Sequence, residues 1–209
     1  MMEGYLVPAG PGEAEFVEKR SRFLGHIRHI ESEEEARAFI AQVKKEHFDA
    51  RHNCWCYLLK DGPERYSDDG EPQGTAGIPM LEVFRREQVT DLVCVVTRYF
   101  GGVLLGAGGL LRAYTKSAKD ALDEAGIAAL RPWSATLIPC AYNQVQRLRQ
   151  ELEALGGKVQ NIDYGAEVTI EALVPQEVFP QLKDRIFDTS RGSIVLEELD
   201  QCFQAVRIR

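Results

Sequence analysis

The stretch LVCVVTRYFGGVLLGAGGLLRAY, residues 92–114, predicts a strand, a glycine-rich turn and a helix in direct succession. Leu92–Val96 is continuously apolar, which is typical of a central strand covered on both faces. The helix is expected to run from about Gly108 to Glu124, with Gly126 ending it. Its inward face is predicted at Leu111, Tyr114, Ala118, Ala121, Leu122 and Ala125.

The turn between this strand and this helix is the strongest candidate for an anion site. Backbone N–H groups and the helix dipole favour negative charge at the start of a helix. Arg112, Lys116 and Lys119 form one stripe on the helix, and a phosphate, a nucleotide or an RNA backbone would suit the place. The alternative is that glycine occurs here only because the helix packs closely on the sheet. The predicted binding residues of the turn are Arg98, Gly101, Gly102, Gly106, Gly108, Gly109, Arg112 and Lys116.

The glycines do not form a known nucleotide motif. Gly101 to Gly106 has the spacing of a P-loop, but Ala107-Gly108 stand where Lys-Ser/Thr is required. Gly106-Ala107-Gly108 begins a dinucleotide fingerprint, yet Leu111 replaces its third glycine. The sequence therefore excludes an ordinary ATPase or dehydrogenase, and we expect no cofactor.

A second candidate is the polar loop SDDGEPQGTAG, residues 67–77. Asp68, Asp69 and Glu71 could hold a hard cation such as Mg²⁺, but their spacing is not that of an EF-hand. The alternatives are a pair of turns with solvated acids, or a loop that contacts a partner or substrate. We expect these acids to flank the anion site and to restrict what enters it, without a bound metal.

His52-Asn53-Cys54-Trp55-Cys56 resembles a metal or nucleophile motif only superficially. On a strand, Cys54 and Cys56 point to the same face, where cysteines mostly pack as small apolar residues. Zinc would need two more ligands, and a Cys54–His52 dyad lacks a third group to orient it. We count His52 with the residues of the binding cleft.

The rest of the chain predicts two α+β domains, at 1–132 and 133–209. In the first, Phe16 and Phe23–Ile30 indicate a hairpin, Ser32–Glu35 a capping box, Asn53–Leu59 a strand and Pro79 the start of a short helix. Arg131-Pro132 mark the boundary.

The second domain has the order βαββαβ, the ferredoxin-like arrangement. Its elements are predicted as strand Ser134–Ala141 (an edge or bulged strand because of Pro139), a helix from Asn143, strand Lys158–Tyr164, a strand alternating from Ala166 to Val174, helix Gln176–Asp188 and strand Ser193–Leu199.

The composition limits the function. The 209 residues are 44% hydrophobic and carry a formal charge of −7, which indicates a folded protein rather than a general binder of polyanions. Uncharged stretches such as Tyr99–Leu111 are too short for a membrane span of about 20 apolar residues. The start lacks the features of a signal peptide, and five scattered cysteines indicate reduced thiols. We expect a cytoplasmic protein without a membrane or disulfide partner.

The motifs RHNCW (residues 51–55), SDDGEP with GTAG (67–77) and RYFGG with LG and Gly109 (98–109) together resemble the YigZ/IMPACT family over essentially the whole chain. The resemblance implies an amino domain with the fold of the second domain of a small-subunit ribosomal protein, and a carboxyl domain similar to a terminal domain of elongation factor G. It implies a link to translation or nucleic-acid binding. Eukaryotic members restrain an amino-acid-starvation kinase with the help of a domain that is absent here. The resemblance supplies no catalytic residues.

We therefore expect a non-catalytic binder of the translation machinery that recognises RNA, the ribosome or a translation factor through the amino domain. Arg98 and the glycine turn would hold phosphate, and Arg112 and Lys116 would add charge. A local basic patch in an acidic protein favours a partner that is recognised by its shape over generic duplex DNA. The alternatives are an enzyme acting on a small phosphorylated or carboxylated substrate in the same cleft, and an adaptor that contacts only proteins.

Overall fold

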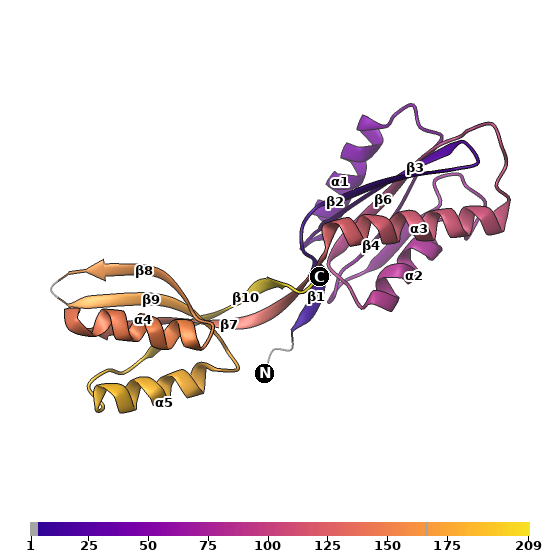
Figure 1. Cartoon of the computed structure of the whole chain (residues 1–209). Coiled ribbons are helices and arrows are strands. Elements are labelled where there is room, and N and C mark those ends of the chain that lie inside the picture. Colours follow the sequence, from indigo (N-terminus) through magenta and orange to yellow (C-terminus); the bar gives the residue numbers. More distant parts are fainter. Residues whose placement is uncertain (1–3, 166) are drawn as a thin grey trace. The chain divides into compact units, whose positions relative to one another are not determined.

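The computed structural model describes residues 4–165 and 167–209, and the chain is an α+β protein (Figure 1). It divides into two compact units, Leu130–Gln204 and Tyr5–Ala129 together with Ala205–Arg209. The last residues belong with the amino unit because Ile127 N donates to Arg209 O and Ile208 N donates to Ile127 O. Strand β7 (Ile127–Cys140) runs without a break through the predicted boundary at Arg131-Pro132. Proline and the residue before it both favour extended backbone, so the pair continues a strand there.

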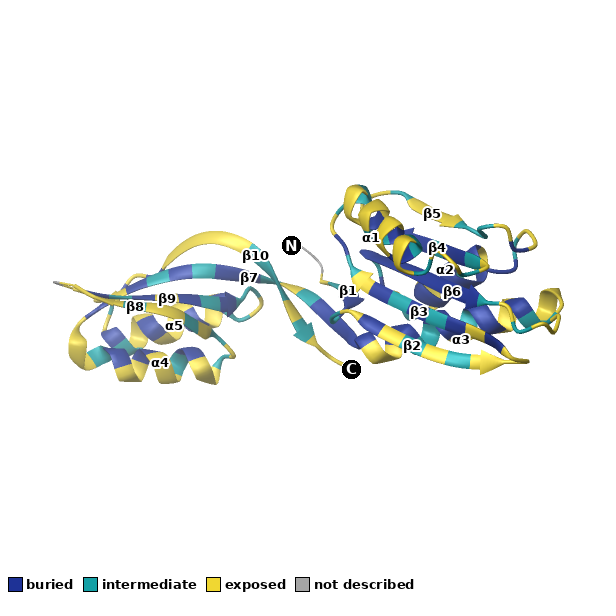
Figure 2. Ribbon diagram, turned by 90° about the horizontal axis from the view of Figure 1, so that it is seen from above, coloured by how far each residue is buried: buried dark blue, intermediate teal, exposed yellow. Residues whose placement is uncertain are grey.

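The amino unit is built on one sheet with the order β2-β3-β6-β4-β5. Strand β6 is central, pairs with both β3 and β4, and is buried from Leu92 to Arg98, as its apolar sequence predicts. Helix α1 covers one face of the sheet, and α2 and α3 cover the other, so the apolar residues form two core clusters (Figure 2). The strands are β2 (Gly12–Glu18), β3 (Ser21–His29), β4 (His52–Leu58), β5 (Glu64–Ser67) and β6 (Leu92–Tyr99).

The three helices of this unit are α1 (Glu33–Glu46), α2 (Gly77–Glu87) and α3 (Ala107–Ala125). Ser32 caps α1 by accepting a hydrogen bond from Glu35 N at 3.2 Å, as the capping box predicts. No helix in the described part of the chain is long and apolar enough to cross a membrane.

The predicted inward face of α3 is wrong at one residue. Leu111 is 44% exposed, whereas Leu110 is 5% exposed and packs in the core. The buried stripe follows Leu110, Ala113, Tyr114 and Ser117, spaced by three and four residues, and Leu111 lies beyond its edge.

The carboxyl unit has the predicted ferredoxin-like order of elements, and its strands are arranged β10-β7-β9-β8. Strand β1 (Tyr5–Pro8), which belongs to the amino unit, also pairs with β7. Two helices pack on this sheet, and one apolar core lies between them and the sheet. The core includes Ile138, Leu148, Ile170 and Leu182. The other elements of the unit are α4 (Val145–Ala154), β8 (Lys158–Tyr164), β9 (Val168–Pro175), α5 (Phe179–Ser190) and β10 (Glu197–Arg207).

Several details of the carboxyl unit differ from the sequence prediction, and α5 begins three residues later and β10 ends eight residues later than predicted. Strand β7 lies inside the sheet between β9 and β10, and it accommodates Pro139 because this residue is exposed and next to the strand's end. Helix α4 begins after the short 3-10 turn Tyr142–Gln144 instead of at Asn143. The last strand begins at Glu197, since Ile194 N bonds to Ser190 Oγ and keeps the preceding loop at the helix end. Ala166 lies outside the described residues.

Replacing Leu110 by alanine is expected to lower the free energy of unfolding by about 2–5 kcal/mol, because it empties a filled core site. The neighbouring exposed Leu111→Ala is expected to change it by less than about 0.5 kcal/mol. Urea unfolding of both variants measures the difference. Equal losses would contradict the position assigned to the buried stripe.

Candidate functional site

The residues singled out in the sequence belong to two different groups in the amino unit. The first is a buried polar cluster, formed by Ser21, His52, Glu71, Arg98 and Tyr114. The second is an open basic cavity beside the first turn of α3. The two groups differ in exposure and therefore in the chemistry that they can perform.

The buried polar cluster is centred on an ion pair between Glu71 and Arg98. Arg98 Nη1 lies 2.6 Å from Glu71 Oε1, and the two side chains are 6% and 3% exposed. Tyr114 Oη donates to the same carboxylate oxygen at 2.8 Å, and Ser21 Oγ accepts from Arg98 Nη2 at 3.4 Å. The charge of Arg98 is thus opposed inside the protein. This arrangement does not fit the expectation that Arg98 cradles a phosphate, because its guanidinium does not face an open cleft.

His52 lies beside this pair, with Nε2 3.8 Å from Glu71 Oε2. Its other nitrogen, Nδ1, lies 2.8 Å from the carbonyl oxygen of Asp69, which can only accept a hydrogen bond. Nδ1 therefore carries the proton and points into the loop. The side chain joins β4 to the acidic loop.

The acids of residues 67–77 also have internal partners. Asp68 accepts three backbone hydrogen bonds, from Gly74, Ala76 and Gly77, at 2.8–3.1 Å. It satisfies the first N–H groups of α2, whose own N-cap residue provides no side-chain bond. Asp69 accepts from Asn53 N and from Lys44 Nζ, each at 2.7 Å.

Each of the three acids therefore binds a different partner, and none is left to restrict entry to a cleft as the sequence suggests. Among the described residues, no three His, Cys, Asp or Glu side chains are placed to share a metal ion. Cys54 donates to Asp68 O at 3.0 Å, and burial raises the pKa of its thiol. A thiolate at Cys54 is disfavoured, so a Cys54–His52 nucleophile has no support in this geometry.

The glycines of the β6–α3 turn serve two purposes. A Cβ atom on Gly101 would lie 2.1 Å from the carbonyl group of Arg20, so only glycine lets the β2–β3 turn pack against this loop. Gly106 has a φ of +73° and caps α3 without a side-chain bond. Gly108 is exposed in the first turn of the helix, next to Gly109. The first N–H groups of α3 thus face an open surface, as an anion site requires.

The basic cavity, of about 240 Å³, lies beside this helix start. Arg112 and Lys116 line it, while Lys119 lines a different cavity and pairs with Glu87 and Asp123. Lys116 pairs with Asp120 and lies over the Phe16 ring. The full lining is Phe16, Glu18, Lys19, Leu105, Gly109, Arg112, Ala113 and Lys116.

Sequence reasoning missed Lys19, Arg20 and Phe100. Lys19 and Arg20 are the two-residue turn between β2 and β3, and both have left-handed backbone, with φ of 46° and 68°. The available signal was a Lys-Arg pair between the two strands of a predicted hairpin. Phe100 is 48% exposed in the β6–α3 loop, and Leu104 is 83% exposed. Large apolar residues in a loop otherwise rich in glycine were the corresponding signal there.

The Glu71→Gln variant is expected to lower the free energy of unfolding by about 3–5 kcal/mol, because it leaves the buried Arg98 guanidinium uncompensated. The matched control is Glu15→Gln, which removes the exposed partner of Arg22 and is expected to leave the unfolding midpoint unchanged. Urea titration measures both. A loss in Glu71→Gln no larger than that in the control would show that the buried pair is not integral to the fold.

Known proteins match the chain over both units. The Impact N-terminal domain family matches residues 19–122, and the Domain of unknown function DUF1949 matches residues 138–193. The IMPACT family member YvyE of Bacillus subtilis is 35% identical over 95% of this chain and 92% of its own length. The IMPACT family member YigZ of Escherichia coli is 36% identical over 96% of this chain and 100% of its own length.

A solved structure described as "Crystal structure of an hypothetical protein" is 36% identical, with a TM-score of 0.60. The alignment covers 96% of this chain and 99% of that one. Sequence and structure thus agree over nearly the full length of these relatives, and the chain belongs to the IMPACT family.

Proposed function

We propose that the amino unit binds RNA of the translation machinery at the basic cavity. The observation that carries the proposal is the position of Lys19 and Arg20. They occupy the two left-handed positions of a β-hairpin turn, where Asn-Gly is the favoured pair. Long cationic side chains are uncommon in this conformation, and backbone strain of this kind clusters at functional sites.

The cations around the cavity are available to a ligand. In the described part of the chain, Lys19, Arg20 and Arg112 have no carboxylate within ion-pair distance, and all three are exposed. Arg22, next to this turn, is paired with Glu15. The N-terminal end of the α3 dipole adds partial positive charge at the same place. A protein of formal charge −7 thus presents a local cationic surface.

The small size of this surface favours RNA of a particular shape over any polyanion. Three free cations neutralise about three phosphates, which corresponds to a slope of about −2 in log affinity against log salt on single-stranded RNA. A protein that coats nucleic acid without regard to its structure makes more phosphate contacts, so its affinity depends more steeply on salt. The link with translation that the family resemblance implies points to the ribosome as the source of this RNA.

The alternative of an enzyme loses its main argument in this geometry. It relied on Asp68, Asp69 and Glu71 as a base or as magnesium ligands, and these acids are engaged with backbone N–H groups, Lys44 and Arg98. Among the described residues, Glu18 provides the one carboxylate in the lining of the basic cavity. The lining combines Lys19, Arg112 and Lys116 with this one carboxylate, which supports anion binding over acid–base chemistry.

The test is co-sedimentation with ribosomes over a salt series, using the double variant Lys19→Asn with Arg20→Gly. We expect association to weaken by about tenfold at physiological salt, since two phosphate contacts are lost. We expect the thermal midpoint to rise at the same time, because the new residues suit the left-handed turn. Arg112→Ala should weaken association without changing the midpoint.

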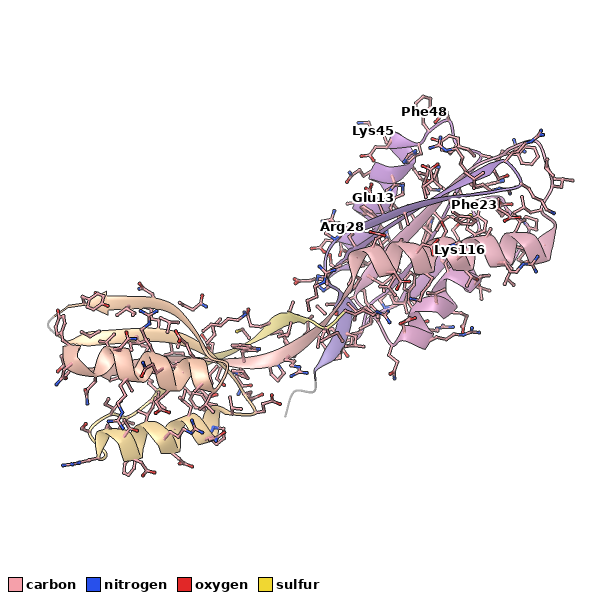
Figure 3. The ribbon with its side chains drawn as sticks, viewed as in Figure 1. Glu13, Phe23, Arg28, Lys45, Phe48 and Lys116 are labelled. Carbon is pink, nitrogen blue, oxygen red and sulfur yellow. The ribbon has the colours of Figure 1, made fainter. Side chains whose placement is uncertain are left out.

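Lys45→Ala is the control, since Lys45 is an exposed cation that has no ion-pair partner among the described residues and lies at the end of α1, away from the α3 face (Figure 3). It should leave association unchanged. Equal association of the double variant and the parent protein at every salt concentration would refute the proposal, as would absence of binding at low salt.

A further inference from the structure

We propose that the RNA at this site is single-stranded and that one of its bases stacks on the ring of Phe100. This inference rests on the proposed function and specifies its ligand. It begins from an exposed aromatic side chain next to the free cations. Phe100 immediately precedes Gly101, against which the backbone of Arg20 packs.

The guanidinium of Arg98 lies over one face of the Phe100 ring and is itself held in place. Arg98 Cζ lies over the ring, 5.6 Å from its centroid, and also 5.5 Å from the centroid of the buried Phe23 ring. Arg98 cannot move easily, because Glu71 and Ser21 hold its two terminal nitrogens. A cation over an aromatic face is itself a favourable contact. Phe100 is therefore positioned in advance, and a base that stacks on it meets a smaller entropic cost.

The surroundings of Phe100 have the composition of a site for single strands. Such sites combine aromatic rings for the bases with cations that follow the backbone. Gly101 N donates to Ser21 Oγ at 3.2 Å, which places the residue after Arg20 beside the residue after Phe100. Lys19, from the same turn, and Arg112 line the basic cavity. A base on Phe100 thus has its flanking phosphates next to free cations.

A duplex does not fit this arrangement equally well. Bases in an RNA helix are stacked on one another, and an aromatic ring reaches them only if the helix opens. Proteins that recognise duplex RNA by shape spread their contacts over about 16 base pairs. Three free cations and one exposed ring form a much smaller surface, which matches a few unpaired nucleotides.

The chain contains a matched control for the stacking residue. Phe48 is 84% exposed and follows α1, where Figure 3 shows it close to Lys45 and away from the α3 face. Its greater exposure makes it the more accessible ring of the two. A preference for Phe100 over Phe48 would therefore come from the local arrangement and not from aromatic exposure alone.

The experiment measures fluorescence anisotropy of a labelled RNA of about 12 nucleotides, alone and annealed to its complement. The proteins are the full chain and its Phe100→Leu, Phe100→Tyr, Phe48→Leu and Arg112→Ala variants. Leucine keeps the apolar volume but has no aromatic face, whereas tyrosine keeps the face. We expect Phe100→Leu to bind the single strand about 5- to 150-fold more weakly, the range for loss of one stacked base. Phe100→Tyr and Phe48→Leu should bind as the parent does.

Each result discriminates between the two proposals. Tighter binding of the single strand, lost in Phe100→Leu but not in Phe100→Tyr or Phe48→Leu, supports the inference. Equal binding of duplex and single strand, or no effect of Phe100→Leu, overturns the inference, and the proposed function survives if Arg112→Ala still weakens binding. No binding of either RNA at low salt overturns the inference, and ribosome co-sedimentation of the parent protein and Arg112→Ala then decides the proposed function separately. Thermal unfolding of each variant confirms that a loss of binding is not a loss of fold.

Discussion

The ion pair between Glu71 and Arg98 is the interaction on which the amino unit depends most. It links the loop before α2 to the central strand β6, and Tyr114 and Ser21 extend it to α3 and β3. Removing two charges from water is costly, and only additional hydrogen bonds to the same groups compensate for it. The four residues provide these bonds together, so the position of each element depends on the others.

This cluster explains why so many charged residues of the signature motifs are not free to bind a ligand. Asp68 holds the start of α2, Asp69 holds β4 and Lys44, and Glu71 holds Arg98. Their role is to fix the loops at one end of the sheet. The residues that remain open to a partner are neighbours of this framework, namely the β2–β3 turn, Phe100 and the first turn of α3.

The glycine-rich turn shows that close packing and anion binding are not exclusive explanations. Gly101 is required by packing, because the carbonyl group of Arg20 occupies the space of a side chain. Gly106 and Gly108 leave the start of α3 open instead, next to Arg112. Packing at Gly101 also brings the Lys19-Arg20 turn close to the start of α3. The close packing at Gly101 therefore places cations beside Gly106 and Gly108.

Local patterns in the sequence determined the elements and the α+β class. Apolar runs, alternation and caps depend on residues close in the chain, which is why β6, the capped helix α1 and the βαββαβ order could be predicted. Of the residues that the same patterns proposed for one site, Gly109, Arg112 and Lys116 line one cavity, whereas Arg98, Glu71 and His52 belong to the buried polar cluster.

Only the tertiary structure decided which charges are free. The partner of Arg98 is 27 residues away, and Lys19 and Arg20 reach the glycine turn from a hairpin about 80 residues earlier in the chain. Charge, hydrogen bonding and burial at these positions depend on contacts between distant segments. A sequence read along the chain shows that an arginine is present, but burial against a carboxylate determines whether its charge can act on a ligand.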